Sequence, residues 1–126
     1  RVLLVHHPPM SGQVKPRKAL RDAAELRTII AQHGVELVLH GHTHHHSHHK
    51  LPGPVAPVPV FGLPSSTACH SSLAKRACLR LYAVKPVDDG WRIEVHDHRL
   101  PPNGCMRPVA GTDGVMSWHA RPNVTA

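Results

Sequence analysis

The sequence is poor in aromatic residues, with one phenylalanine, one tyrosine and two tryptophans among its 126 residues. Proteins that bind single-stranded nucleic acid without sequence preference stack successive bases on aromatic side chains. So few aromatic side chains cannot form such a surface. We therefore do not expect single-stranded nucleic acid as the partner of this chain.

Cysteine is also scarce, and the cysteines Cys69, Cys78 and Cys105 include no Cys-x-x-Cys pair. An odd number without such a pair argues against a disulfide framework and against a zinc site built from thiolates. Free thiols are typical of proteins kept in a reducing compartment, so we expect a cytoplasmic location.

Long apolar runs are absent as well. No stretch is long and apolar enough to span a bilayer, and no signal peptide is recognisable, so we expect no membrane partner. The chain starts at Arg1 directly in an apolar run, as a truncated chain would. We expect the native N-terminus to lie upstream.

Acidic residues are outnumbered, with eight Asp and Glu against 15 Lys and Arg, for a formal charge of +7. A basic surface attracts anionic partners such as phosphate esters, although a solvated surface without a partner has the same composition. The basic residues gather weakly in two stretches, 15–21 and 75–80.

Histidine, in contrast, is abundant, and its most informative occurrence is Leu-Val-Leu-His-Gly-His-Thr-His at residues 37–44. The apolar run predicts a short buried strand that ends where Gly41 lets the backbone turn. On a tight turn, His42 and His44 can both reach one point. Neutral imidazole is the commonest nitrogen ligand of transition metals, so we interpret this pair as part of a two-metal hydrolase site.

A second histidine pair follows the first apolar run of the chain. The continuous run Val2–Val5 is typical of a strand buried on both faces, and it ends at His-His-Pro-Pro over residues 6–9. Residues 18–33 carry apolar side chains at spacings of three and four, which predicts an amphipathic helix ending before Gly34.

Together with a strand predicted over residues 35–39, these segments form a β-α-β unit. Its two strands are parallel and end at the same edge of the sheet, where ligands bind in open α/β folds. The topology therefore predicts that His6 and His42 meet at that edge.

The histidines that follow, His45, His46, His48 and His49, read as a loop that binds divalent metals adventitiously. Residues 59–64 predict a short strand between prolines. Residues 79–84 and 91–96 alternate in polarity around Asp89-Gly90 and predict a hairpin. Residues 1–100 then form one domain, and residues 101–126 read as a poorly ordered tail.

Over residues 2–100 the sequence resembles the calcineurin-like metallophosphoesterase superfamily. Val-His-His-Pro-Pro at 5–9 is similar to the late histidine motif of that family, and Gly-His-Thr-His at 41–44 matches its final G-H-x-H motif. The helix, the stretch Pro-Val-Pro-Val-Phe-Gly-Leu-Pro-Ser at 57–65 and the closing hairpin resemble the bacterial branch that includes cyclic-nucleotide phosphodiesterases.

The resemblance implies a fold, a ligand set and cofactors. The fold is α/β, the C-terminal part of a metallophosphoesterase β-sandwich with flanking helices. His6 and His42 would share one metal and His44 would bind the other, in a centre of two divalent ions (Mn, Fe or Zn) acting on a phosphate-ester substrate. His7, His40, Gly41 and Thr43 would lie beside the ligands or on the substrate side.

The same family requires D-x-H, G-D-x-x-D and G-N-H-[DE] motifs, and none of them occurs in this sequence. The chain then carries no complete catalytic set, and we expect at most weak binding of a single metal. Two other functions stay open, a non-catalytic His-rich metal-binding module and a basic nucleic-acid-binding fragment.

Overall fold

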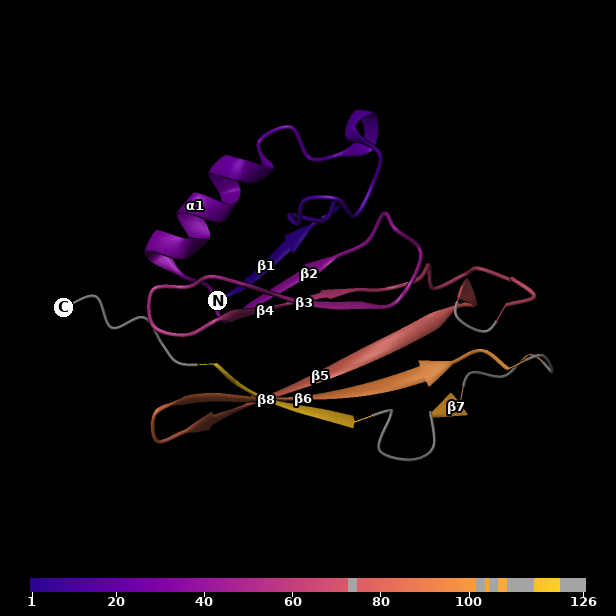
Figure 1. Cartoon of the computed structure of the whole chain (residues 1–126). Coiled ribbons are helices and arrows are strands. Elements are labelled where there is room, and N and C mark those ends of the chain that lie inside the picture. Colours follow the sequence, from indigo (N-terminus) through magenta and orange to yellow (C-terminus); the bar gives the residue numbers. More distant parts are fainter. Residues whose placement is uncertain (73–74, 102–103, 105–106, 109–114, 121–126) are drawn as a thin grey trace.

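The computed structural model describes residues 1–72, 75–101, 104, 107–108 and 115–120. Three layers are stacked in the described part (Figure 1): helix α1 (Ala23–His33), a four-stranded sheet, and a second, antiparallel sheet. The protein is thus a small α/β domain, as the sequence predicts at this level. No helix in the described part is long and apolar enough to cross a membrane.

The first sheet holds β1 (Val2–Val5), β2 (Leu37–His40), β4 (Val58–Gly62) and β3 (Ser47–Leu51), in that spatial order. Strands β1, β2 and β4 are parallel, whereas β3 runs antiparallel to β4. The predicted parallel pairing of the first two strands is confirmed, with β2 shifted toward the C-terminus. The short strand predicted between prolines is confirmed as β4.

Both faces of β2 and β4 are covered, which explains why these two strands are continuously apolar. On one face, Val38 and Val60 pack against Ile30 of α1. On the other face, Leu37 and Phe61 pack against the second sheet. The core therefore has two parts, one on each side of the first sheet. The expectation that Val2–Val5 is also buried on both faces is wrong, because β1 is the edge strand of the sheet and leaves Val2 53% and Leu4 72% exposed.

Helix α1 begins at Ala23, not at residue 18 as the periodicity predicts. Pro16 instead starts a separate 3-10 turn, η1 (Pro16–Lys18), and Ala19 after it is extended with a ψ of 155°. The C-terminal end agrees with the prediction. Gly34 has a φ of 65°, and its N–H donates to the carbonyl of Ile30 at 2.8 Å.

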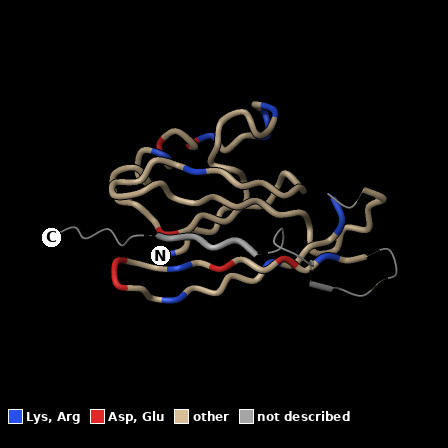
Figure 2. Tube along the Cα trace, turned by 60° about the horizontal axis from the view of Figure 1, so that its bottom comes forward, with Lys and Arg blue, Asp and Glu red and all other residues tan. Residues whose placement is uncertain are grey.

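The second sheet is built on the hairpin of β5 (Cys78–Val87) and β6 (Gly90–Arg99), which confirms the predicted antiparallel pair. The turn lies one residue earlier than predicted. Val87 pairs with Gly90, so that Asp88 and Asp89 form the connection. Figure 2 shows this acidic tip in red.

Two predictions of irregular structure are wrong. His48 and His49 lie in β3, not in a loop. Within the expected tail, β7 (Arg107–Pro108) and β8 (Val115–Ala120) both pair with β6. These strands form because a neighbouring strand offers its backbone, which local sequence does not reveal. The predicted thiol Cys105 lies outside the described residues.

Candidate metal centre

Two neighbouring strand ends carry the histidines of the candidate site. His6 and His7 follow β1 directly, and His42 lies two residues beyond the end of β2. The register pairs the last residue of β1, Val5, with the last residue of β2, His40. The Gly41 N–H then donates to the His6 carbonyl at 3.2 Å and extends this pairing past the sheet. The parallel ladder therefore brings the two histidine segments side by side.

The segment after β1 is also held against the helix. Pro8 and Pro9 are fully buried, and Arg27 of α1 donates from Nη1 to the Pro9 carbonyl at 2.8 Å. Proline cannot continue the ladder because it has no N–H and a fixed φ. The prolines thus end β1 and fix the backbone just beyond the two histidines.

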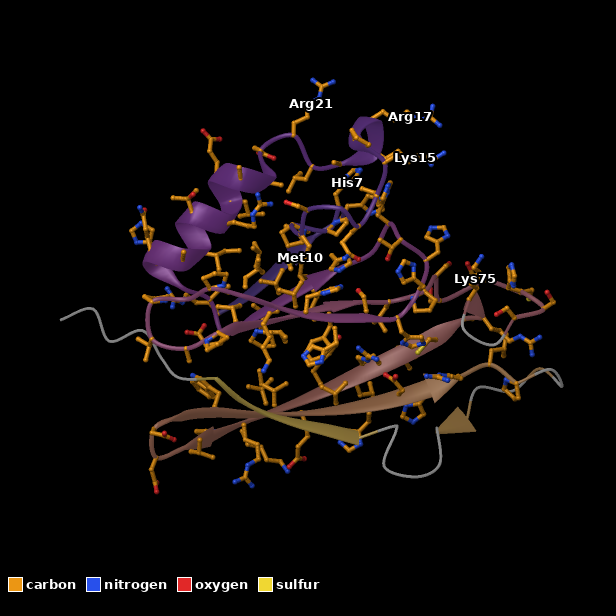
Figure 3. The ribbon with its side chains drawn as sticks, viewed as in Figure 1. His7, Met10, Lys15, Arg17, Arg21 and Lys75 are labelled. Carbon is orange, nitrogen blue, oxygen red and sulfur yellow. The ribbon has the colours of Figure 1, made fainter. Side chains whose placement is uncertain are left out.

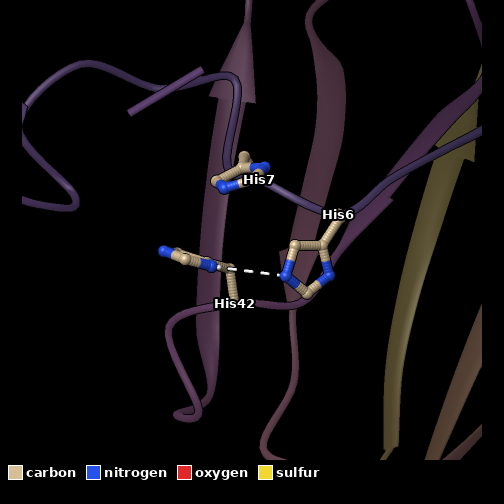
Figure 4. Close-up of side chains that lie close together, drawn as sticks. All are labelled: His6, His7 and His42. Atoms are coloured by element: carbon tan, nitrogen blue, oxygen red, sulfur yellow. Dashed lines mark hydrogen bonds between the residues drawn. The ribbon is translucent and has the colours of Figure 1, made fainter. Parts of the chain in front are cut away.

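The rings of His6, His7 and His42 form one group (Figure 4), with one nitrogen from each lying within 4.8 Å of the others. The closest contact is 3.3 Å, between His42 Nδ1 and His6 Nε2. The ring centroids of His7 and His42 are 4.3 Å apart, and those of His6 and His7 are 4.9 Å apart. Three imidazoles at such separations can turn toward a single ion.

The contact between His42 and His6 requires one nitrogen to donate its proton and the other to accept it. A bound metal would take the place of that proton, since ligation uses the lone pair of each neutral ring. Partial burial lowers the pKa of His42, and the charges of His7, His6 and Lys18 lower it further. This environment favours the neutral ring that a metal needs.

The turn that presents His42 is strained. Thr43 N–H donates to the Gly41 carbonyl at 2.7 Å, closing a three-residue turn around His42, whose φ is 65°. A γ-turn with positive φ is the rarer and more strained form. Gly41 has no positive φ, and a Cβ placed on it would meet His6 only at 3.9 Å. Gly41 therefore lies at the turn as expected, but a side chain at this position would not crowd the site.

The structure places His44 and His7 differently from the prediction, which had His44 as a metal ligand and His7 beside the ligands. His44 is exposed, has a φ of 56°, and is not part of the three-ring group. It lies close enough for its charge to act on His42. His7, which we expected beside the ligands or on the substrate side, contributes a ring nitrogen to the group. The described geometry thus joins His6 and His42 as predicted but takes His7 as the third ring.

His40 is a structural residue. Its side chain is buried, Nδ1–H donates to the Gly41 carbonyl at 3.0 Å, and Nε2 lies 3.4 Å from the Ser47 hydroxyl. Burial lowers its pKa. A Cβ on Gly62 would lie 2.5 Å from its Cε1, so the ring occupies space that only a glycine in β4 leaves free. His40 thus holds the turn through the Gly41 carbonyl and is not part of the three-ring group.

The His-rich tract is not one loop of free ligands. His45 donates from Nδ1 to the Thr43 carbonyl at 2.9 Å. The His48 ring stacks on Phe61, with centroids 4.6 Å apart and planes 15° from parallel. His46 Nδ1 lies 3.3 Å from Arg80 Nη2. Each of these rings thus has a specific neighbour.

A second group of potential ligands, His46, Cys78 and Asp97, lies between the sheets. Asp97 is buried and accepts from Nε and Nη2 of Arg80, the latter at 2.7 Å. Burial alone would raise the pKa of Asp97, but the Arg80 hydrogen bonds and charge outweigh it and hold that pKa below its usual value. Burial also raises the pKa of the Cys78 thiol. The group is therefore an ion pair with a protonated thiol beside it, which disfavours a cation.

The sequence contains a signal for this ion pair that we did not use. Along β6, Ile93, Val95 and Asp97 alternate with more exposed residues, so the acid occupies a core-facing position. A carboxylate at such a position requires a cation from a facing strand. Its partner in the register is Arg80, which we had counted among the surface cations.

The sequence matches no protein-family model and no curated protein. The functional interpretation therefore depends on the residues themselves: two strand ends, three converging imidazoles and the charges beside them.

Proposed function

We propose that this chain supplies the imidazole ligands of the metal centre of a metal-dependent phosphoesterase. The observation that carries the proposal is the convergence of His6, His7 and His42 from two parallel strand ends, with one nitrogen of each within 4.8 Å of the others. These rings lie at the carboxyl edge of the sheet, where open α/β folds bind ligands. The reaction class, hydrolysis of a phosphate ester, is inferred from the resemblance of the two histidine motifs to those of metallophosphoesterases. The fold would then be the C-terminal part of the β-sandwich of that family.

The three rings fit one divalent transition metal, because imidazole suits such ions and the separations are small. A pair of such ions, when bound, activates water and clamps the oxygens of a phosphate. Among the described residues, no carboxylate belongs to the three-ring group. Without a carboxylate between them, two dications would repel each other strongly. We therefore propose that this chain binds one metal weakly and needs the missing carboxylate motifs for turnover on a phosphate ester.

A non-catalytic metal-binding module is the second candidate. The all-imidazole character of the group in the described residues favours it, since binding alone needs no carboxylate. The two functions differ in one property. A module would never hydrolyse phosphate esters, whatever sequence precedes the chain.

Metal binding is tested by calorimetric titration of the purified chain with Mn²⁺ or Zn²⁺. His6→Ala, His7→Ala and His42→Ala should each weaken metal binding at least roughly tenfold. Replacing a residue that only hydrogen-bonds to a metal ligand already lowers metal affinity by that factor. His44→Ala tests the family assignment directly: the geometry predicts little effect, and the resemblance predicts a loss. A variant with His45, His46, His48 and His49 replaced together controls for adventitious binding. Unchanged affinity in all three single variants would refute the site.

Catalysis is tested with a chromogenic phosphodiester and added Mn²⁺. We expect no turnover by the 126-residue chain. If the coding frame upstream contains D-x-H, G-D-x-x-D and G-N-H, the longer chain should hydrolyse the ester, and His42→Ala should abolish the activity. An upstream sequence without those motifs, and no hydrolysis by the longer chain, would leave the binding module as the function.

A further inference from the structure

A pocket of about 250 Å³ opens beside His42. One wall is the basic loop, residues 13–18, which connects β1 to α1 and contributes Lys15, Arg17 and Lys18. The other wall is the turn after β2, with His42, Thr43 and His45. The pocket therefore adjoins the candidate metal centre through His42.

The lining of this pocket is positive on one side and contains no carboxylate. Elsewhere in the described part, Arg80 and Lys85 are each paired with an acid. No Asp or Glu of the described residues lies within ion-pair distance of Lys15, Arg17 or Lys18. Figure 3 shows Lys15 and Arg17 on the loop beside His7. Three unpaired cations around one hollow create a positive potential that attracts an anion.

A polar group inside the pocket also lacks a partner. Thr43 lines the pocket, and its Oγ1 is buried without a hydrogen bond to any described residue. Buried hydroxyls are usually hydrogen-bonded, so an unpaired one calls for an explanation. An anion seated between the loop and the turn would accept this hydrogen bond after a rotation of the side chain. This observation is independent of the charges.

The basic loop holds its own shape. Lys18 N–H donates to the Lys15 carbonyl at 2.8 Å, and Ala19 N–H donates to the Pro16 carbonyl at 3.1 Å. Pro16 restricts the backbone further, and Gly12 makes the bend before the loop with a φ of 76°. A loop fixed in this way presents its cations without a large ordering cost on binding.

From these contacts we infer that the basic loop binds a second anionic group of the substrate, next to the phosphate that reacts at the metal centre. The substrate class is then a small phosphate compound with at least two neighbouring anionic groups, of which pyrophosphate is the smallest representative. The volume of the pocket is below the roughly 300 Å³ at which pockets for drug-sized ligands begin, so the pocket suits one small anionic group. This inference rests on the proposed function for the identity of the reacting phosphate.

The test is calorimetric binding of pyrophosphate and of inorganic phosphate to the metal-free chain. Pyrophosphate should bind more tightly than phosphate, and added salt should weaken it. Lys15→Ala, Arg17→Ala and Lys18→Ala should each weaken pyrophosphate binding by roughly threefold to fivefold, the effect of losing one exposed ion pair. All three changes lie on an exposed loop, and circular dichroism checks the fold.

Arg21→Ala is the matched control. It removes the same charge from the same region, but Arg21 does not line the pocket. Figure 3 shows Arg21 apart from Lys15 and Arg17. It should leave binding nearly unchanged. No pyrophosphate binding, or an equal loss in Arg21→Ala and Arg17→Ala, would overturn the inference. Because the chain is metal-free in this assay, that failure is separate from failure of metal binding, which the histidine variants report.

Discussion

Single side chains at the candidate site depart from ordinary conformations. His42 and His44 both have positive φ, a region that residues other than glycine enter rarely, although histidine does so more often than most. Such strain persists where surrounding structure imposes it, and it gathers at functional sites. Here the strained backbone of the turn places the imidazole of His42 beside His6.

The strain at His44 predicts that glycine is more stabilising than alanine at this position, the reverse of the usual order. Glycine in place of alanine normally destabilises by roughly 0.5–1 kcal/mol, but at a positive φ the order reverses. His44→Gly should therefore be more stable than His44→Ala by about 1 kcal/mol, measured by urea unfolding. At His45, which is exposed and has no positive φ, alanine should be the more stable of the two. If the glycine and alanine variants had the same order of stability at His44 and at His45, the strain in the turn would be contradicted.

At the level of strand pairs, β5 and β6 are joined by the Arg80–Asp97 ion pair as well as by the backbone ladder. The two side chains are only 4% and 5% exposed, so neither can recover full hydration if its partner is removed. Removing one partner of a buried pair is costly because the other charge remains buried. The pair thus constrains which residues these two strands can bring together.

Asp97→Asn should lower the free energy of unfolding by about 3–5 kcal/mol, measured in guanidinium. Replacing both partners, as Arg80→Met with Asp97→Leu, should recover most of that loss, because no charge is then left buried. A single and a double variant of equal stability would show that the charge itself contributes nothing.

The same pair predicts a pH dependence. The pKa of Asp97 is lower in the folded state, so the unfolded state binds the proton more readily. Stability from this group is therefore complete above the unfolded pKa of about 3.9 and is lost as pH falls through the lower folded value. Wild type should lose this contribution below pH of about 4, whereas Asp97→Asn should not.

Across the whole molecule, Phe61 is the side chain that connects the layers. It belongs to β4, is 1% exposed, and packs in one cluster with Leu37 of β2 and Ile93 of β6. Its ring also lies 5.4 Å from the Arg80 guanidinium carbon. Phe61 of the first sheet thus contacts both the apolar core residues and the Arg80 side chain of the second sheet.

Phe61→Ala should lower the free energy of unfolding by about 3–5 kcal/mol, the range for removing a large core side chain. Leu81→Ala is the control, since Leu81 lies on β5 but is 51% exposed, and it should change stability by less than roughly 0.5 kcal/mol. Equal effects of the two substitutions would mean that the sheets are not joined at Phe61.

The local sequence pattern alone was sufficient to predict the β-α-β unit, its parallel strands and the hairpin. Each depends on interactions a few residues apart or on a rule that follows from element order. The approach of His6 to His42 was predictable for the same reason, since consecutive parallel strands end at one edge. Gly34 also ends the helix as its position indicates.

Other features depended on partners far away in the chain. The third ring of the site is His7 and not His44, because side-chain direction after a strained turn follows from backbone angles that no motif encodes. Strands β3 and β8 form because β4 and β6 present unpaired backbone to them. Asp97 meets Arg80 through the hairpin register, 17 residues apart. Non-local pairing satisfies hydrogen bonds and charges that the local sequence leaves open.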